Sequence, residues 1–185
     1  MDINALLSTI LSNESVAGVA AQAGVKEQDV KNVLGSALPM LLHGANAQSA
    51  DANCAESFAG ALAQHAQRDT TNITDFLRNV DVKDGAKIIS HLLGSAEQNQ
   101  TAEVARKAGI STASTGNILA SVAPLLMSLL GKQTASEKDS GLGVSGLMGA
   151  LLKGGDMTDL IGSLLGGSNK KKSGLGLLMG LLGKR

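Results

Sequence analysis

The chain has 185 residues, a formal net charge of zero and a hydrophobic share of 43%, enough for a folded core in one domain or two small ones. With two Phe and no Trp or Tyr, that core must be aliphatic, and the chain offers no aromatic platform for stacking bases or sugars. Residues 1–135 hold 9 basic and 12 acidic side chains, which argues against strong phosphate binding.

Cysteine content and hydropathy indicate the compartment. Cys54 is the only cysteine, so an intrachain disulfide is excluded, in agreement with reducing surroundings. The N-terminus shows no basic segment ahead of an apolar run, and no stretch reaches the roughly 18 apolar residues of a spanning helix. We therefore expect neither a signal peptide nor a membrane span, and a cytoplasmic location.

The first third of the chain is predicted to be helical, because strand-like alternation and Asn-Gly turns are missing. An amphipathic stripe over 6–11 precedes a helix over about 16–23, for which Asn13 and Ser15 are the expected caps. Gly24 is expected to end that helix, because glycine readily adopts the left-handed backbone found past a helix end.

A short helix is predicted next, over 26–34, and Gly35 is expected to end it. Ser36 is then expected to cap a further helix with Pro39 in its first turn, where proline is tolerated. His43 would lie near the end of that helix. The chain up to Lys132 would hold eight to ten helices in all.

An internal duplication organises these elements, because residues 13–41 return as residues 98–126 at an offset of 85. The identical pairs are Ala17/Ala102, Val19/Val104, Ala20/Ala105, Ala23/Ala108, Gly24/Gly109, Asn32/Asn117, Leu34/Leu119, Ser36/Ser121, Pro39/Pro124 and Leu41/Leu126. The shared features are apolar spacing and helix punctuation, not reactive side chains. They predict an internally duplicated all-α domain over 1–133, with helix-turn-helix-like copies at about 6–44 and 88–131.

Two connecting helices are expected in the interval 51–79, near 51–67 and 70–78. The first would carry Cys54, Phe58, Leu62 and His65 near one face. Composition then changes after Lys132: a polar linker over 133–140 leads into a Gly/Leu-rich tail, and we assign 134–185 to this flexible or short-helical region.

The tail admits three functions. It could be a spacer, it could form Leu-faced helices that pack on other chains, or it could lie on a membrane surface with Lys170–Lys172 against anionic lipid. Exposed Leu and Met with little charge make a surface that associates. We expect self-association or binding of a protein partner through the tail.

A resemblance to a family rests on order and spacing. The motifs are Ala23-Gly24-Val25, Val33-Leu34, Leu38-Pro39-Met40-Leu41-Leu42, Asp84-Gly85, Lys87-Ile88-Ile89, His91 and Gly94, followed by the second copy. Over residues 3–133 the chain resembles the bacterial family called domain of unknown function 937, for which a Gly/Leu-rich tail is also typical. The resemblance implies a homeodomain-like helical arrangement and supplies no reaction or functional residues.

Nucleic-acid binding is the alternative function, because the two corners resemble helix-turn-helix units. The residues offered to a groove would be Lys26, Glu27, Gln28, Asp29, Lys31 and Asn32 in the first copy and Ser111, Thr112, Ala113, Ser114 and Asn117 in the second. The first set is charge-balanced and the second holds no cation, which disfavours this alternative. Arg106 and Lys107 lie on the helix before the second corner.

Other motifs have structural explanations. Gly141–Gly146 spells G-x-G-x-x-G, but without the preceding strand that a dinucleotide site needs.

His65 and His91 could ligate a metal with Cys54, Glu56, Asp69 or Asp84, but none forms a paired ligand motif. Cys54 and His65 would lie about 16 Å apart on one helix, too far for a nucleophilic pair. Asp81 and Asp84 flank a helix start, where a carboxylate caps or occupies the first turn.

The sequence therefore predicts no enzymatic activity and no catalytic, cofactor-binding or metal-ligating residues. It predicts a non-catalytic structural or interaction module.

Overall fold

A computed structural model describes residues 3–137, and this part of the chain is all-helical, as predicted. The tail at 138–185, with its Gly141–Gly146 motif and Lys170–Lys172, lies outside the described residues. The elements are α1 (Ile3–Ile10), α2 (Asn13–Ala23), α3 (Glu27–Ala50), α4 (Ala55–Ala66), α5 (Ile73–Arg78), α6 (Val82–Leu93), a 3-10 turn η1 (Gly94–Ala96), α7 (Glu97–Ala108) and α8 (Thr112–Glu137).

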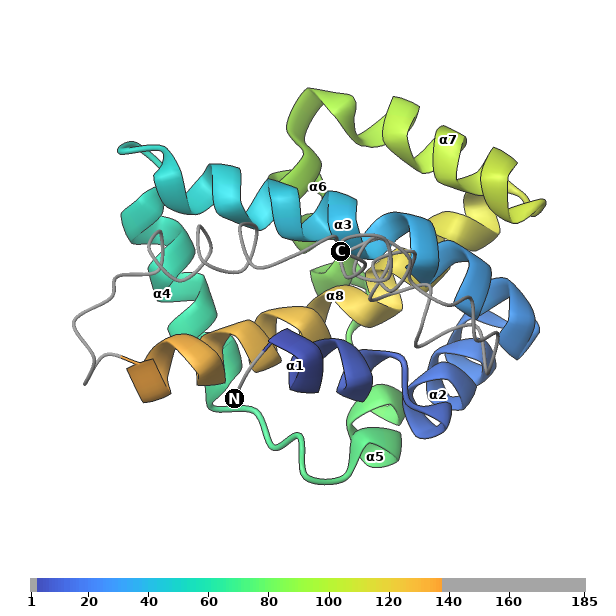
Figure 1. The fold of residues 1–185 in the computed structure, drawn as a ribbon, viewed down its shortest axis with the longest axis horizontal. Coiled ribbons are helices and arrows are strands. Elements are labelled where there is room, and N and C mark those ends of the chain that lie inside the picture. Colours follow the sequence, from blue (N-terminus) through green and yellow to red (C-terminus); the bar gives the residue numbers. More distant parts are fainter. Residues whose placement is uncertain (1–2, 138–185) are drawn as a thin grey trace, which may run out of the picture.

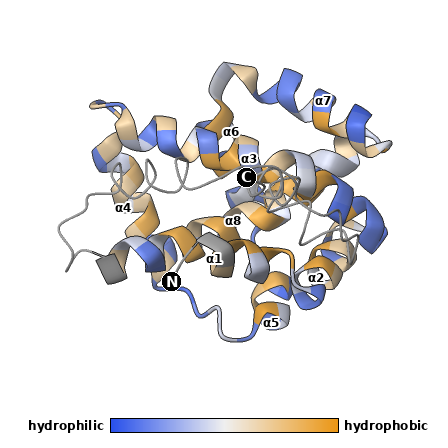
Figure 2. Ribbon diagram, viewed as in Figure 1, coloured by the Kyte–Doolittle hydropathy of each residue, from blue (hydrophilic) through white to orange (hydrophobic). Residues whose placement is uncertain are grey.

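Helix α8 forms the centre of the domain. It contacts α1, α2, α4, α5, α6 and α7 as well as α3, and these helices surround it in Figure 1. Every residue from 118 to 131 is buried, which is why the orange apolar colour follows much of this helix in Figure 2. An apolar helix surrounded by others is stabilised by burial on all sides.

The burial of α8 bears on the membrane expectation. By length and composition, Thr112–Ala135 within α8 is apolar enough to cross a membrane, so the expectation that no stretch reaches this limit was wrong. Most of that window is buried inside the domain, which is the position of a core helix. The apolar side chains of such a helix are buried against other helices of the same protein.

Helix α3 is a single helix of 24 residues, and the predicted break at Gly35 was wrong. Gly35, Ser36 and Pro39 all lie inside it, and His43 is an exposed mid-helix residue instead of a terminal one. An interior glycine costs about 1 kcal/mol relative to Ala. Burial of Val33, Leu34, Leu38 and Leu41, all fully inaccessible, outweighs that cost.

The same correction applies to α8. Ser121 does not cap a new helix, because its hydroxyl donates a 2.8 Å hydrogen bond to the carbonyl of Asn117 one turn earlier. Pro124 lies within the helix, and the polar residues after Lys132, predicted as a linker, continue α8 to Glu137. The burial of apolar side chains therefore keeps α3 and α8 helical through the serine and proline that were expected to start new helices.

Helix starts differ from the prediction by a few residues. Ser12, not Asn13 or Ser15, caps α2, and its side chain accepts a hydrogen bond from the Ser15 backbone N–H. The Ser15 hydroxyl is buried and donates to the Thr9 carbonyl at 2.6 Å. Cys54 precedes α4 and is partly exposed, so it is not a buried helix-face thiol.

Glycines mark the places where helices cross most closely. A Cβ atom at Gly85 of α6 would overlap the Ala120 carbonyl oxygen of α8, and one at Gly131 of α8 would overlap the Leu62 carbonyl oxygen of α4. Only a residue without a side chain permits such backbone approach. These two crossings fix α6 and α4 against the central helix.

The two predicted corners have the same backbone geometry. Gly24 after α2 and Gly109 after α7 have φ of 67° and 73°, and their N–H groups bond to the carbonyls of Ala20 and Ala105. The residue after each glycine donates to the same carbonyl. Helices α3 and α8 then begin at positions that differ by 85 in the sequence.

Candidate functional site

The turns between α2 and α3 and between α7 and α8 are the first candidate, since they carry the residues considered for nucleic-acid reading. Lys26, Glu27 and Gln28 are exposed at the start of α3, and Ser111, Thr112 and Ala113 are exposed at the start of α8. Each set is therefore accessible, but the helices that follow enter the domain core within one turn, at Val30 and Thr115.

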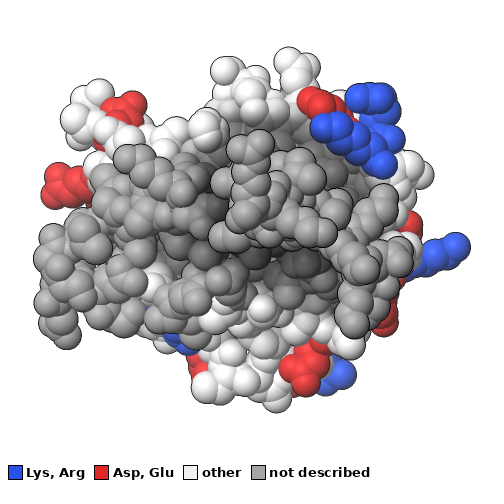
Figure 3. Space-filling model, viewed as in Figure 1, with Lys and Arg blue, Asp and Glu red and all other residues white. Residues whose placement is uncertain are grey.

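Two carboxylates near these corners have partners close to them in sequence. Lys107 pairs with Glu103 at 2.8 Å along α7, and the Lys26 backbone N–H donates to the Asp29 carboxylate at 3.3 Å. The lysines and arginines visible in Figure 3 lie beside acidic side chains. Phosphate binding needs clustered positive charge. The largest group of cationic side chains in this view, at the upper right, lies beside an acidic side chain.

An ionisable cluster joins α4 and the residues just after it to α6, and only its histidine is buried. The Asp84 carboxylate, in the first turn of α6, accepts a 3.0 Å hydrogen bond from the Arg68 guanidinium and lies 3.8 Å from Nε2 of His65. The His65 side chain is buried, and its Nδ1 atom has no hydrogen-bond partner in the structure. The sequence named Asp84 among several candidate partners of His65 without a motif that joins them, because only the packing of α4 and α6 against α8 brings them together.

The charge state of His65 follows from this environment. Burial lowers the pKa of His65 below its ordinary value of 6.5, the nearby Arg68 cation lowers it further, and the Asp84 carboxylate opposes both. His65 is therefore neutral at pH 7 and does not form an ion pair with Asp84.

We expect His65 to make the domain less stable at mildly acidic pH. The folded pKa lies below the unfolded one, so the unfolded state takes up the proton first and protonation favours unfolding. The stability that neutral His65 confers is complete above pH 6.5 and is lost as the pH falls from that value through the folded pKa. Urea unfolding of His65→Gln between pH 7.5 and 5 should show a shallower pH dependence than the wild type.

The matched control is His91→Gln, since His91 is exposed on α6. An unchanged pH slope in His65→Gln, or an equal change in His91→Gln, would contradict this assignment.

Metal ligation is not supported by the residues 3–137. No group of three or more His, Cys, Asp or Glu side chains in that range converges to hold an ion. The Arg68 cation beside Asp84 would also repel a metal there. Asp81 caps α6 by accepting the backbone N–H groups of Lys83 and Asp84, and the Asp69 side chain accepts from Thr71. These carboxylates therefore have structural partners.

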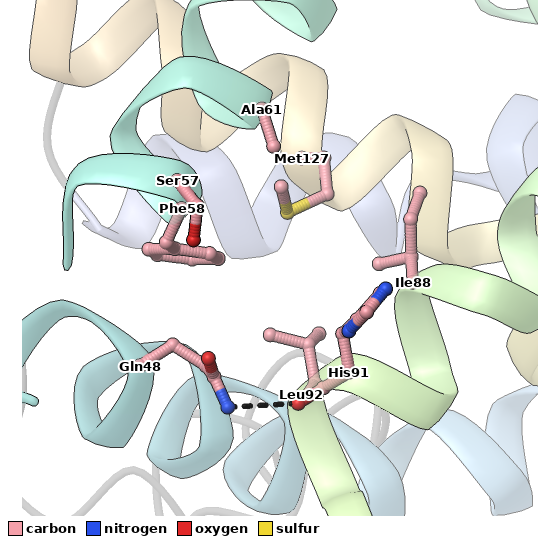
Figure 4. A pocket seen from close by; sticks show the side chains of 8 residues that line it. All are labelled: Gln48, Ser57, Phe58, Ala61, Ile88, His91, Leu92 and Met127. Atoms are coloured by element: carbon pink, nitrogen blue, oxygen red, sulfur yellow. Dashed lines mark hydrogen bonds between the residues drawn. The ribbon is translucent and has the colours of Figure 1, made fainter. Parts of the chain in front are cut away.

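An apolar pocket of about 200 Å³ lies where α3, α4, α6 and α8 meet (Figure 4). Its lining residues are Gln48, Ser57, Phe58, Ala61, Ile88, His91, Leu92 and Met127. The Gln48 side-chain amide donates a 2.8 Å hydrogen bond to the His91 carbonyl and so joins α3 to α6 across the pocket. His91 is the sole ionisable group among the lining residues, so acid–base chemistry between two such groups has no basis here.

The described residues thus define an all-helical domain built around a buried central helix. The chain belongs to the family described as "Bacterial protein of unknown function (DUF937)", whose model matches residues 5–133. This confirms the family resemblance of the sequence. No curated protein matches the chain, and no solved structure does.

Proposed function

We propose that this protein is a non-catalytic structural or interaction module that associates with copies of itself through the Gly/Leu-rich residues beyond Glu137. The observation that carries the proposal is that α1–α8 build a hydrophobic core within the described part of the chain. Leucines and other apolar residues of α1–α8 make up this core, with Leu126 and Leu130 fully inaccessible on the central helix. Residues 138–185 add twelve more leucines.

Those extra leucines need a partner surface. Burying a leucine side chain is worth about 1.5–3 kcal/mol, so a sequence rich in them gains from association. Glycines at every third or fourth position permit close backbone approach between helices. Self-association therefore explains the composition of this segment better than a spacer does. The competing outcome is contact with an anionic membrane surface, which Lys170–Lys172 would favour.

We also propose that the domain consists of two homeodomain-like copies related by duplication. Support comes from the matching corners at Gly24 and Gly109 and from reciprocal packing: α2 contacts α8, and α7 contacts α3. Packing of a duplicated unit on its own copy accounts for this architecture without assuming a catalytic centre. A cytoplasmic location is part of this proposal.

The test compares the full chain with a full-length Leu160→Asp, Leu164→Asp variant by light scattering. The full chain should be oligomeric, and the variant should be a monomer, because two carboxylates in the segment 156–165 cannot be buried between copies. The matched control, Lys170→Gln with Lys171→Gln and Lys172→Gln, should remain oligomeric. A chain ending at Glu137, which leaves α8 intact, should also be a monomer. A monomeric full chain would refute the proposal.

Nucleic-acid association is the second candidate, and the left-handed glycine corners before α3 and α8 are the observation in its favour. A gel shift with random duplex at about 50 mM salt tests it, because phosphate contacts are strongest at low salt. We expect no shift, since the corner residues are charge-balanced. A shift that disappears as salt is raised would replace the self-association proposal with this one.

A further inference from the structure

Helix α3 presents an uncharged stripe to its surroundings, whereas the corresponding stripe on α8 is buried. The α3 stripe consists of Gly35, Ser36, Pro39, His43, Asn46 and Ala47, which are all half-buried or exposed. No Asp, Glu, Lys or Arg occurs between residues 32 and 50. At the offset of 85, the first five stripe positions correspond to α8 residues that are all buried: Ala120, Ser121, Pro124, Ser128 and Gly131.

Helix α4 covers the C-terminal part of that stripe on α8. Gly131 meets the Leu62 carbonyl oxygen of α4, and a Cβ atom at Gly131 would lie 3.0 Å from the Cβ atom of Ala66. Helix α4 begins four residues after α3 ends, and it carries Phe58, Leu62 and His65 on its buried face. The helix that follows α3 therefore packs on α8.

The segment that follows α8 has the features of a second α4. At an offset of 86, Phe58, Gly60, Leu62, His65 and Ala66 correspond to Val144, Gly146, Met148, Leu151 and Leu152. With Leu147, the apolar members of this set stand at helical spacing i, i+3, i+4, i+7 and i+8. Residues 141–152 hold no charged side chain, like the α3 stripe, and begin three residues beyond the end of α8.

We propose that residues 141–152 of the same chain pack as a helix on the α3 stripe, as α4 packs on α8. This rests on the duplication proposed above and goes beyond self-association, because it assigns the first part of the tail to the domain and leaves residues 156–182 for other copies. The same correspondence relates contacts that the structure shows. The contact of α2 with α8 corresponds to that of α7 with α3, and the contact of α1 with α8 corresponds to that of α6 with α3.

The correspondence specifies a pair of positions that should be adjacent. Gly131 maps to Asn46, and Ala66 maps to Leu152. Because Asn46 carries a Cβ atom where Gly131 has none, the docked segment must lie slightly farther from α3 than α4 lies from α8, and Asn46 and Leu152 should then have Cβ atoms near the 3.5–4.5 Å that a disulfide requires. The full chain carrying Cys54→Ser, Asn46→Cys and Leu152→Cys should therefore form a disulfide on oxidation. The matched control replaces Asn46→Cys with Gln28→Cys, eighteen residues or about 27 Å away along α3.

The expected result is a disulfide within one chain, seen on a non-reducing gel and by peptide mass, at least about tenfold more abundant for position 46 than for position 28, since docking raises the local concentration of the two thiols. Equal yields, no disulfide at position 46, or a disulfide between two chains would each overturn the proposal. Adding Leu160→Asp and Leu164→Asp should abolish association and leave the intrachain disulfide, which separates this inference from the proposed function.

A second readout does not depend on disulfide geometry. In the full chain with Cys54→Ser and Asn46→Cys, the thiol at position 46 should alkylate at least about tenfold faster after Met148→Asp, because a carboxylate disfavours docking on an uncharged surface. Met179→Asp, in the last apolar segment, should leave the rate unchanged. A rate insensitive to Met148→Asp would overturn the docking.

Discussion

Replacing Gly85 by alanine should destabilise the domain by about 3 kcal/mol, more than most single substitutions do. The added Cβ atom would overlap the Ala120 carbonyl oxygen, which belongs to the backbone of the central helix and has no rotamer to change. Helices α6 and α8 would have to separate, and Ile88 and Leu92 of α6 would lose part of their packing. The shift in the urea midpoint at pH 7 measures the effect.

Gly60→Ala is the matched control for this result. Gly60 lies within α4 and a Cβ atom there meets nothing within 4 Å. Alanine is favoured over glycine in a helix interior by about 1 kcal/mol, so this variant should be slightly more stable than the wild type. Equal stability changes at the two positions would show that Gly85 does not mark a close helix crossing.

Truncating Leu126 to alanine should cost about 2–5 kcal/mol, because a cavity would form around the middle of α8. Leu126 is fully inaccessible and lies on the helix that contacts every other α-helix of the described part. The surrounding helices are held by several crossings and can collapse only partly into the space. Thermal or urea unfolding gives the loss of stability directly.

The comparison variant is Leu126→Met, which keeps the side-chain volume and should cost less than about 1.5 kcal/mol. If alanine at this position cost no more than methionine does, α8 would not be the centre of the core.

Local sequence signals predicted the corners well and the helix lengths poorly. Gly24 and Gly109 ended their helices as expected, because the left-handed conformation is a local preference of glycine. Gly35 did not end a helix, and Pro39 does not lie in a first turn, because the burial of the apolar side chains along α3 outweighs these local preferences. A local helix-breaking preference of about 1 kcal/mol is overcome wherever tertiary packing stabilises the helix by several kcal/mol.

The polar cluster shows what spacing alone does not reveal. His65 and Asp84 belong to different helices, and no motif links them in the sequence. Their approach depends on two separate crossings with α8, at Gly131 and at Gly85, whose glycines mark the contact but not its partner. The prediction that Asp84 caps or occupies a helix first turn was correct, because that role depends only on neighbours.

The most direct test of the proposed function is sedimentation velocity of the full chain over a hundredfold range of concentration. We predict species larger than a monomer that dissociate on dilution and that Leu160→Asp with Leu164→Asp abolishes, while the folded helical signal persists. A full chain that sediments as a monomer throughout that range would contradict the account.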